Sequence, residues 1–240
     1  VILHDVGISC RRIVNGLKEL HIDMAQVEGI FISHEHSDHI AGLQQLLKRF
    51  DIPVYTKQGT WREIQDKLIV PKNQLIELTK GSLTLGNLIL EPFAVSHDAA
   101  DPIGINVFAG KDKATVVTDT GVISDNILRR MDDTTLLVLE ANYDPHMLRF
   151  GPYQPFLKQR VASDEGHLSN EMAAQALLMM NRPDFMQVIL AHRSENNNNA
   201  VLVTQTIGKM LIDGGVRIGP EMKLQHGQPN EIVSMKSVKR

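Results

Sequence analysis

His34-Glu35-His36-Ser37-Asp38-His39 places three imidazoles and a carboxylate, all able to bind a metal, within six residues. If the apolar run at residues 29–33 is a strand, His34 and His36 continue it with a period of two and point to the same side. Asp38 and His39 then lie where the chain turns into a helix and face a second point nearby. Such ligands suit a two-metal hydrolytic site. The alternative is a solvated turn with Asp38 as a helix N-cap, which the tight clustering disfavours.

Five apolar runs each end in a residue that can bind a metal or move a proton. These residues are His34, His97, Asp119, Glu140 and His192. Buried strands that deliver polar groups at one end build a site on a rigid scaffold. Taken alone, His97 is explained better by a strand end and His192 by a core histidine, and Asp119 could instead stabilise a turn. Beside the histidine-rich motif, a ligand role is favoured for all three.

The alternation of apolar runs and helical patterns, without a linker or repeat, predicts one domain over residues 1–240. Helices are expected at residues 40–50, 61–68, 169–180 and 200–212. Strands are expected at residues 29–33, 54–56, 87–95, 105–109, 114–118, 135–139 and 187–191.

The net charge of −3 argues against a large basic surface that wraps nucleic acid. Basic residues gather in three groups, each explained most simply as a solvated face: Arg11, Arg12 and Lys18; Arg149, Lys158 and Arg160; and Lys236, Lys239 and Arg240. The lone Cys10 excludes an internal disulfide and fits a reducing compartment, so a cytoplasmic location is expected. No apolar run reaches membrane-spanning length.

The His-x-His-x-Asp-His spacing resembles the signature of the metallo-β-lactamase fold superfamily, and the resemblance extends along the whole chain. Further segments resemble the YycJ/WalJ family of bacterial DNA exonucleases: residues 95–102 (VSHDAADP), 118–121 (TDTG), 139–142 (LEAN), 166–170 (GHLSN) and 191–196 (AHRSEN). The resemblance implies an α/β (α+β) fold, the αββα sandwich in which two mixed β-sheets are flanked by helices. It also implies that one or two native strands precede Val1.

The resemblance further implies two divalent cations, Mn²⁺ or Zn²⁺. The ligands that it implies are His34, His36 and His97 for the first cation, Asp38, His39 and His192 for the second, and Asp119 as a bridge. Asp38 is expected to be catalytic as well as a ligand. Asp5 matches an aspartate that orients the metal-binding loop, although a simple turn explains it equally well. Phosphate contacts are expected from Ser194, Asn196, Asn197 and Asn198.

The segment Gly166-His167-Leu168-Ser169-Asn170 resembles the Gly-His-Ser-Thr element of RNase Z-type phosphodiesterases. In those enzymes the histidine lies beside the leaving oxygen and pairs with an acidic residue that ends a strand, the place that Glu140 holds here. A carboxylate partner favours the protonated imidazole and fixes its tautomer, as a general acid requires. The alternative is that His167 only belongs to the cap of the following helix.

These features predict a phosphodiester hydrolase in which two cations share a hydroxide and His167 protonates the departing sugar oxygen. The resemblance implies DNA, degraded from a 5′ end in the 5′-to-3′ direction. Alternatives on the same fold are an RNA-processing or small cyclic phosphodiesterase and a thioester or lactone hydrolase, whose better leaving groups have less need of an acid such as His167. RNA processing of the β-CASP type needs a large insertion, and only 72 residues lie between Asp119 and His192. An oxygen-reducing di-iron enzyme is disfavoured by His36, and a decayed binding module by the complete ligand set.

Overall fold

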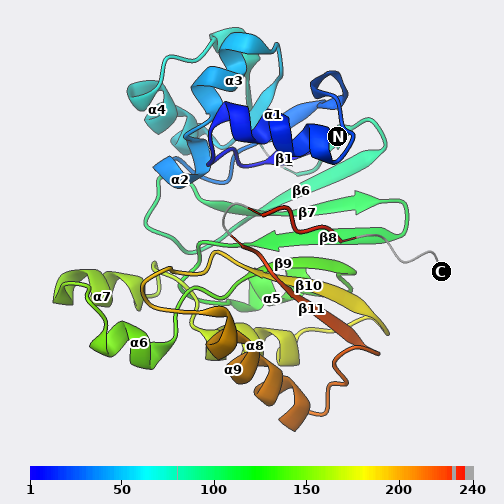
Figure 1. Ribbon diagram of the computed structural model, residues 1–240. Helices are drawn as coiled ribbons and strands as arrows, with labels where there is room; N and C mark the ends of the chain where they lie inside the picture. The colour runs from blue at the N-terminus through cyan, green and yellow to red at the C-terminus, as the bar shows by residue number, and fades with distance from the viewer. Residues whose placement is uncertain (80, 229–230, 236–240) are drawn as a thin grey trace. The chain divides into compact units, whose positions relative to one another are not determined.

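The computed structural model describes residues 1–79, 81–228 and 231–235, which divide into two compact units (Figure 1). Unit 1 comprises Val1–Asn87 and Ala99–Ile103, and unit 2 comprises Leu88–Asp98 and Gly104–Arg240. The basic group at Lys236, Lys239 and Arg240 lies outside the described residues. Among those described, no helix is long and apolar enough to cross a bilayer.

The sheet of unit 1 has four strands in the order β1-β2-β3-β4, and each strand is parallel to its neighbour. Its strands are β1 (Ile2–His4), β2 (Gly29–Phe31), β3 (Val54–Thr56) and β4 (Leu75–Glu77). The inner strands β2 and β3 are buried along their whole length, as expected for continuous apolar runs. Because parallel strands end at the same edge, β1 and β2 deliver Asp5 and residues 34–39 to neighbouring positions.

The helices of unit 1 are α1 (Cys10–Glu19), α2 (Ser37–Ile40), α3 (Leu43–Arg49) and α4 (Gln58–Lys67). The remaining elements are the 3₁₀ turns η1 (Met24–Gln26) and η2 (Lys72–Gln74) and the strand β5 (Leu83–Leu85). Apolar side chains from α1, α3 and α4 pack on β2 and β3 in one core that includes Ile13, Leu46 and Ile64.

The single helix expected at residues 40–50 is divided into α2 and α3, which is a correction. The division falls at Gly42, whose backbone lies against the segment that follows β1. Gly42 N donates to Val6 O at 2.8 Å, and a Cβ atom at Gly42 would meet Ile8 O at 2.3 Å. This close approach fixes the start of α3 and requires glycine.

The strands of unit 2 follow the sheet order β11-β10-β9-β8-β7-β6. They are β6 (Leu88–Ala94), β7 (Ile103–Ala109), β8 (Asp112–Val117), β9 (Leu136–Glu140), β10 (Met186–Ala191) and β11 (Met222–His226). Strands β8 to β11 are parallel and β7 is antiparallel to β8, so this sheet is mixed. Two mixed sheets were expected, whereas the sheet of unit 1 is parallel throughout.

The helices of unit 2 are α5 (Asp125–Met131), α6 (Pro145–Phe150), α7 (Pro155–Val161), α8 (Asn170–Met179) and α9 (Ala200–Asp213). Helices α8 and α9 lie side by side, and their residues Leu177 and Ile207 share a core with Leu137 of β9 and Val188 of β10 (Figure 1). Both helices begin with a capping side chain, Ser169 for α8 and Asn199 for α9. The expected helices at residues 169–180 and 200–212 are confirmed to within one residue.

The parallel strands β8, β9 and β10 bring polar residues to one edge of the sheet. Leu139 lies opposite Val117, and Glu140 lies opposite Ala191. Asp119 and His192 therefore follow the ends of two strands that flank Glu140. This register, which places three of the predicted site residues at one edge, is the main contribution of the fold to the site.

Candidate metal centre

In unit 1, the histidines of the predicted metal-binding motif form a cluster after β2. His34 Nε2 and His36 Nδ1 lie 3.1 Å apart, and the ring centroids of His34 and His39 lie 4.0 Å apart. Two ligands of one tetrahedral Zn²⁺, each about 2.1 Å from it, lie about 3.4 Å apart, so the His34–His36 pair fits a shared cation. Asp38 Oδ2 lies 3.8 Å from His39 Nε2.

Asp5 holds this motif through a carboxylate that accepts three hydrogen bonds. The donors are Ser33 N at 2.8 Å, Ser33 Oγ at 2.8 Å and His39 Nδ1 at 2.7 Å. Because Nδ1 of His39 is bonded to a carboxylate, Nε2 is the nitrogen that can coordinate a metal. The segment after β1 also approaches the motif closely at Gly7, where a Cβ atom would meet Asp38 O at 1.5 Å. This geometry favours the orienting role of Asp5 over a simple turn.

The ionisation of Asp5 follows from its surroundings. Burial raises the pKa of the Asp5 carboxyl, but the charge of His4 and hydrogen bonds from His39 and Ser33 outweigh burial and hold the pKa well below its usual value. Since folding lowers this pKa, the resulting stabilisation is complete above the pKa of an unfolded aspartate, about 3.9, and is lost as the pH falls below it.

His4, for which the sequence offered no role, stacks on Phe31 with ring centroids 5.4 Å apart.

In unit 2, the structure brings together all five residues that the sequence predicted for this part of the site: His97, Asp119, Glu140, His167 and His192. Ligand atoms of the last four all lie within 4.8 Å of one another. Asp119 Oδ1 is 3.4 Å from His192 Nε2 and 3.7 Å from His97 Nε2. Asp119 therefore lies beside one predicted ligand of each cation, as a bridging carboxylate would.

Glu140 is fully buried and accepts hydrogen bonds from two histidines. Its Oε1 lies 2.8 Å from Nδ1 of His167 and 2.8 Å from Nδ1 of His192. Its Oε2 accepts Leu168 N at 3.1 Å and Thr120 N at 3.3 Å. Burial raises the pKa of Glu140, but the hydrogen bonds from both histidines outweigh burial and hold the pKa well below its usual value. The carboxylate is therefore ionised at neutral pH and fixes the orientation of both rings.

His97 is buried in a position that favours its neutral form. Its Nδ1 donates to Gly166 O at 3.0 Å, and its other ring nitrogen, Nε2, faces Asp119. Burial lowers the pKa of His97, while the nearby Asp119 carboxylate opposes that shift. A neutral imidazole is the form that binds a metal. Together with the carboxylates, these histidines give a mixed nitrogen and oxygen donor set, which suits Zn²⁺ or Mn²⁺.

Three of the site residues have backbone conformations that residues other than glycine seldom adopt. The φ angles are 55° at Asp5, 55° at Asp119 and 52° at His192. Such conformations cost about 1–3 kcal/mol each and persist where the surroundings enforce them, often at functional sites. At all three positions the chain turns sharply just after a strand, and this turn directs the side chain into the cluster.

The four predicted phosphate contacts divide into two groups. Asn197 and Asn198 are buried, and Asn198 Nδ2 donates to Ala141 O at 3.0 Å and to Asn170 Oδ1 at 2.8 Å. These bonds indicate a structural role for Asn198, and the burial of Asn197 likewise leaves its amide little access to a phosphate. Ser194 is half-buried and Asn196 is exposed, so phosphate contact stays a prediction for these two.

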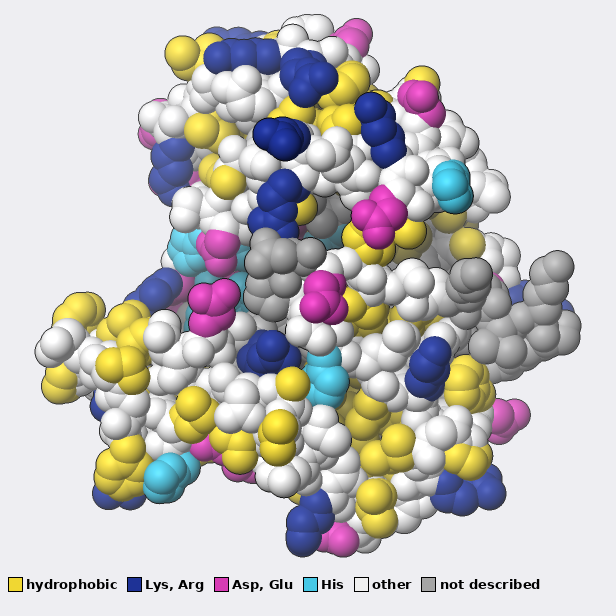
Figure 2. Space-filling model, viewed as in Figure 1, with side chains coloured by type: hydrophobic (Ala, Val, Ile, Leu, Met, Phe, Trp, Pro, Cys, Tyr) yellow, Lys and Arg dark blue, Asp and Glu magenta, His cyan; other side chains and the backbone are white. Residues whose placement is uncertain are grey.

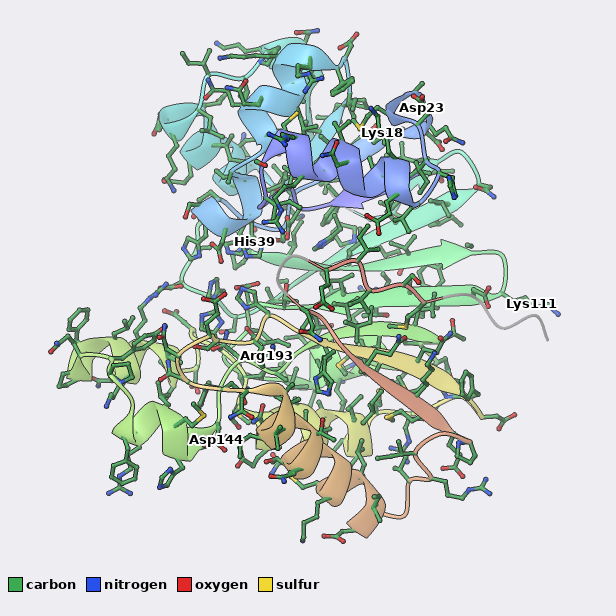
Figure 3. The ribbon with its side chains drawn as sticks, viewed as in Figure 1. Lys18, Asp23, His39, Lys111, Asp144 and Arg193 are labelled. Carbon is green, nitrogen blue, oxygen red and sulfur yellow. The ribbon has the colours of Figure 1, made fainter. Side chains whose placement is uncertain are left out.

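Sequence reasoning missed several residues that support the cluster. Asn142 Nδ2 donates to His192 O at 2.8 Å, and the Arg160 guanidinium pairs with Asp98, the neighbour of His97. The second partner of Glu140, His192, was also missed, because the adjacency of β9 and β10 is a tertiary property. Arg193, labelled in Figure 3, follows His192, and its NH1 atom is buried without a hydrogen-bond partner among the described residues.

Comparison with known proteins shows the family of the chain. The profile of the family described as beta-lactamase superfamily domain matches residues 2–192. The exodeoxyribonuclease YycJ of Bacillus anthracis is 33% identical over 230 residues, which cover 95% of this chain and 87% of that protein. The exodeoxyribonuclease WalJ of Streptococcus pneumoniae serotype 2 is 31% identical over 234 residues, with the same 95% and 87% coverage.

Solved structures show the same fold at low sequence identity. YhfI of Bacillus subtilis, a metallo-β-lactamase fold protein, aligns with a TM-score of 0.67 and 15% identity over 93% of this chain and 83% of its own. Zn²⁺-bound PqqB of Methylobacterium extorquens aligns with a TM-score of 0.65 and 14% identity, covering 94% and 79%.

The fold and the histidine–carboxylate clusters define a hydrolase of the metallo-β-lactamase superfamily. Within that superfamily, the chain belongs to the family of YycJ and WalJ. The predicted fold, with two sheets and flanking helices, is confirmed.

Replacing Asp5 should destabilise the chain even without metal. Asp5→Ala leaves Ser33 N, Ser33 Oγ and His39 Nδ1 without their acceptor, so we expect a loss of about 2–4 kcal/mol in the free energy of unfolding. Urea unfolding in the presence of a chelator measures it. Asp66→Ala, an exposed carboxylate on α4, is the matched control and should change stability by less than about 0.5 kcal/mol. Equal effects of the two variants would contradict the orienting role.

Proposed function

We propose that the chain is a metal-dependent nuclease that hydrolyses phosphodiester bonds of DNA from a 5′ end, in the 5′-to-3′ direction. The observation that carries this proposal is the 2.8 Å pair between Glu140 and His167, next to the Asp119–His192 cluster. A histidine held by a buried carboxylate supplies a proton donor, which a phosphodiesterase needs because its leaving group is an alkoxide. The names of the relatives, exodeoxyribonucleases YycJ and WalJ, support DNA as the substrate.

For the metals, we keep the ligand sets expected from the sequence. The donor chemistry of both clusters fits: in His39, His97 and His192, Nδ1 is bonded to an oxygen, so that Nε2 is the coordinating nitrogen. Bound divalent cations would supply an acidified water and neutralise charge on the phosphoryl oxygens.

The chain's own residues have distinct tasks in this mechanism. Glu140 holds Nδ1 of His167, so Nε2 of His167 delivers its proton to the departing sugar oxygen. Asp5 and Glu140 fix the rings of His39 and His192, and Ser194 and Asn196 steady the phosphate. Asp38 keeps the catalytic role expected from the sequence.

The rival substrates are distinguished by specific features. A thioester expels a thiolate, which is far less basic than an alkoxide, so the proton held by the Glu140–His167 pair would contribute little there. RNA is the nearest rival, because ribonuclease J of Mycobacterium tuberculosis is 31% identical over 117 residues, although these cover only 46% of this chain. The chain aligns with YycJ over twice as much of its length, which favours DNA.

Digestion of end-labelled strands tests the proposal directly. With Mn²⁺ or Zn²⁺ added, 5′-labelled DNA should release labelled short products at once, while 3′-labelled DNA should shorten progressively. Matched RNA strands should be cut more slowly. Release from a 3′ label first would overturn the direction, and a preference for RNA would overturn the substrate.

Metal analysis tests the ligand assignment. The metal-replete chain should bind up to two cations, His34→Ala or His192→Ala should lose about one each, and His167→Ala should keep both, because His167 is assigned as a proton donor. Elemental analysis after dialysis measures the ratio. His146→Ala, on α6 and outside both clusters, is the control. Loss of metal from His167→Ala alone would contradict the assignment.

The general-acid role predicts a selective loss of activity. His167→Ala should reduce turnover of DNA by roughly 10²–10⁴, the range for a general acid. An activated ester such as bis(p-nitrophenyl) phosphate leaves as a stabilised phenolate, so its hydrolysis should fall much less. Steady-state kinetics on both substrates give the ratio of losses, and equal losses with metals still bound would remove the role.

Glu140→Gln should show the same selectivity in milder form. It is a less clean variant, because Glu140 also holds His192, and the change should weaken metal retention as well. Metal content must therefore be measured on the same preparation. If Glu140→Gln keeps all its metal and loses activity equally on DNA and on the activated ester, the part assigned to Glu140 is contradicted.

A further inference from the structure

Two short helices of unit 2, α6 and α7, form a projection that we call the α6–α7 arm (residues 145–161; Figure 1). The arm contains Arg149, Lys158 and Arg160 but no Asp or Glu, although acidic residues outnumber basic ones in the chain, 28 to 25. The preceding acid, Asp144, accepts Met147 N and caps α6 (Figure 3). The arm is therefore a locally cationic element in an acidic protein.

The arm also exposes two aromatic rings. Phe150 is 67% exposed and Phe156 is 71% exposed, whereas Phe31 and Phe93 are buried. Figure 2 shows hydrophobic side chains at the surface over α6 and α7, with Lys and Arg side chains beside them. Leu148, Val161 and Tyr143 form the core of the arm, with Tyr153 and Leu157 packed against them. Neither Phe150 nor Phe156 belongs to this core, although the ring of Phe150 lies beside that of His146, with centroids 4.6 Å apart.

A cation lies next to one of these rings, and a second cation is bonded to the backbone of the first. The Arg149 guanidinium carbon is 5.3 Å from the centroid of Phe150, and Lys158 Nζ donates to Arg149 O at 2.8 Å. Arg160 is already paired with Asp98, so we assign it to holding the arm in place. The exposed surface of the arm therefore combines aromatic faces with the two cations Arg149 and Lys158.

The arm is tied to the segments that carry the site residues of unit 2. His167 N donates to Val161 O at 2.9 Å at the end of α7. Tyr153 Oη accepts Asn196 Nδ2 at 3.4 Å, in the loop after His192. Arg160 pairs with Asp98, which follows His97. A ligand strand bound along the arm would therefore extend toward His97, His167 and His192.

We propose that the α6–α7 arm binds an unpaired stretch of the nucleic acid substrate. Bases stack on Phe150 and Phe156, and phosphates lie near Arg149 and Lys158. Aromatic platforms beside cations bind single strands without sequence preference, because every base has a π-face and only an unpaired base can expose it. The inference rests on the proposed function and narrows its substrate to single-stranded DNA or unpaired ends. A second copy of the chain is a less suitable occupant, because a symmetric contact would bring two cationic arms together.

Conservative variants test the stacking. Phe150→Leu and Phe156→Leu keep apolar bulk but remove the aromatic face, so each should raise KM for single-stranded DNA by about 5-fold or more, the lower end for stacking. Phe150→Tyr and Phe156→Tyr should restore it. Blunt duplex DNA should respond less, and hydrolysis of bis(p-nitrophenyl) phosphate should be retained. Ile212→Ala, 61% exposed on α9, is the control for removing exposed apolar bulk.

A second pair of variants tests the charges. Arg149→Gln with Lys158→Gln should make the dependence of log affinity on log salt shallower by about 0.7 for each lost phosphate contact. Lys111→Gln, an exposed lysine in the turn between β7 and β8, removes a charge elsewhere and should leave the slope unchanged. Equal slopes for all variants would remove the phosphate contacts from the proposal.

The outcomes separate this proposal from the proposed function. If the wild-type chain digests DNA but the leucine variants match it, the arm proposal fails and the nuclease stands. If tyrosine does not restore what leucine loses, stacking is refuted. A change of oligomeric state on size exclusion, with KM unaltered, would assign the arm to contacts between copies. If the chain hydrolyses bis(p-nitrophenyl) phosphate but neither binds nor digests nucleic acid, both proposals fail.

Discussion

The buried carboxylate of Glu140 is the interaction on which the site of unit 2 depends. A buried charge is stable only when hydrogen bonds replace its lost hydration. Glu140 obtains them from His167, Leu168, His192 and Thr120, which lie in three separate segments of the chain. The requirement to satisfy one charge therefore fixes the positions of three loops at the edge of the sheet. Removing the carboxylate would leave several buried donors without an acceptor, so we expect local structure and chemistry to fail together.

In unit 1, the Asp5 carboxylate is stabilised by hydrogen bonds in the same way. Asp5 follows β1 as Glu140 ends β9, and each carboxylate takes Nδ1 of a histidine so that Nε2 is presented to a ligand. In both cases, hydrogen bonds from neighbouring groups outweigh burial and hold the carboxyl pKa low. The histidines proposed as metal ligands are thus oriented before any ligand arrives, which is the preorganisation that a rigid hydrolytic site requires.

Much of the fold and of the site was predictable from local patterns. Apolar runs located the strands β2, β3, β6 to β10, and helical periodicity located α4, α8 and α9, because burial on one face leaves a trace in a short window. The short elements α6 and α7 left no such trace, since each spans fewer than two turns and each carries one exposed phenylalanine ring. The expected helix at residues 40–50 was divided at Gly42 by a backbone contact with Ile8, a residue distant in sequence.

The sequence by itself identified the candidate ligands, through the spacing of residues 34–39 and the polar ends of five apolar runs, because those signals lie within a few consecutive residues. The tertiary structure alone decided how these side chains are shared. The parallel register of β9 and β10 places His192 beside Glu140 as its second histidine partner. Asn198 is buried, and its side chain is hydrogen-bonded to Asn170. The physical reason is that a hydrogen-bond partner and an exposed fraction depend on segments brought together from distant parts of the chain, which no local pattern records.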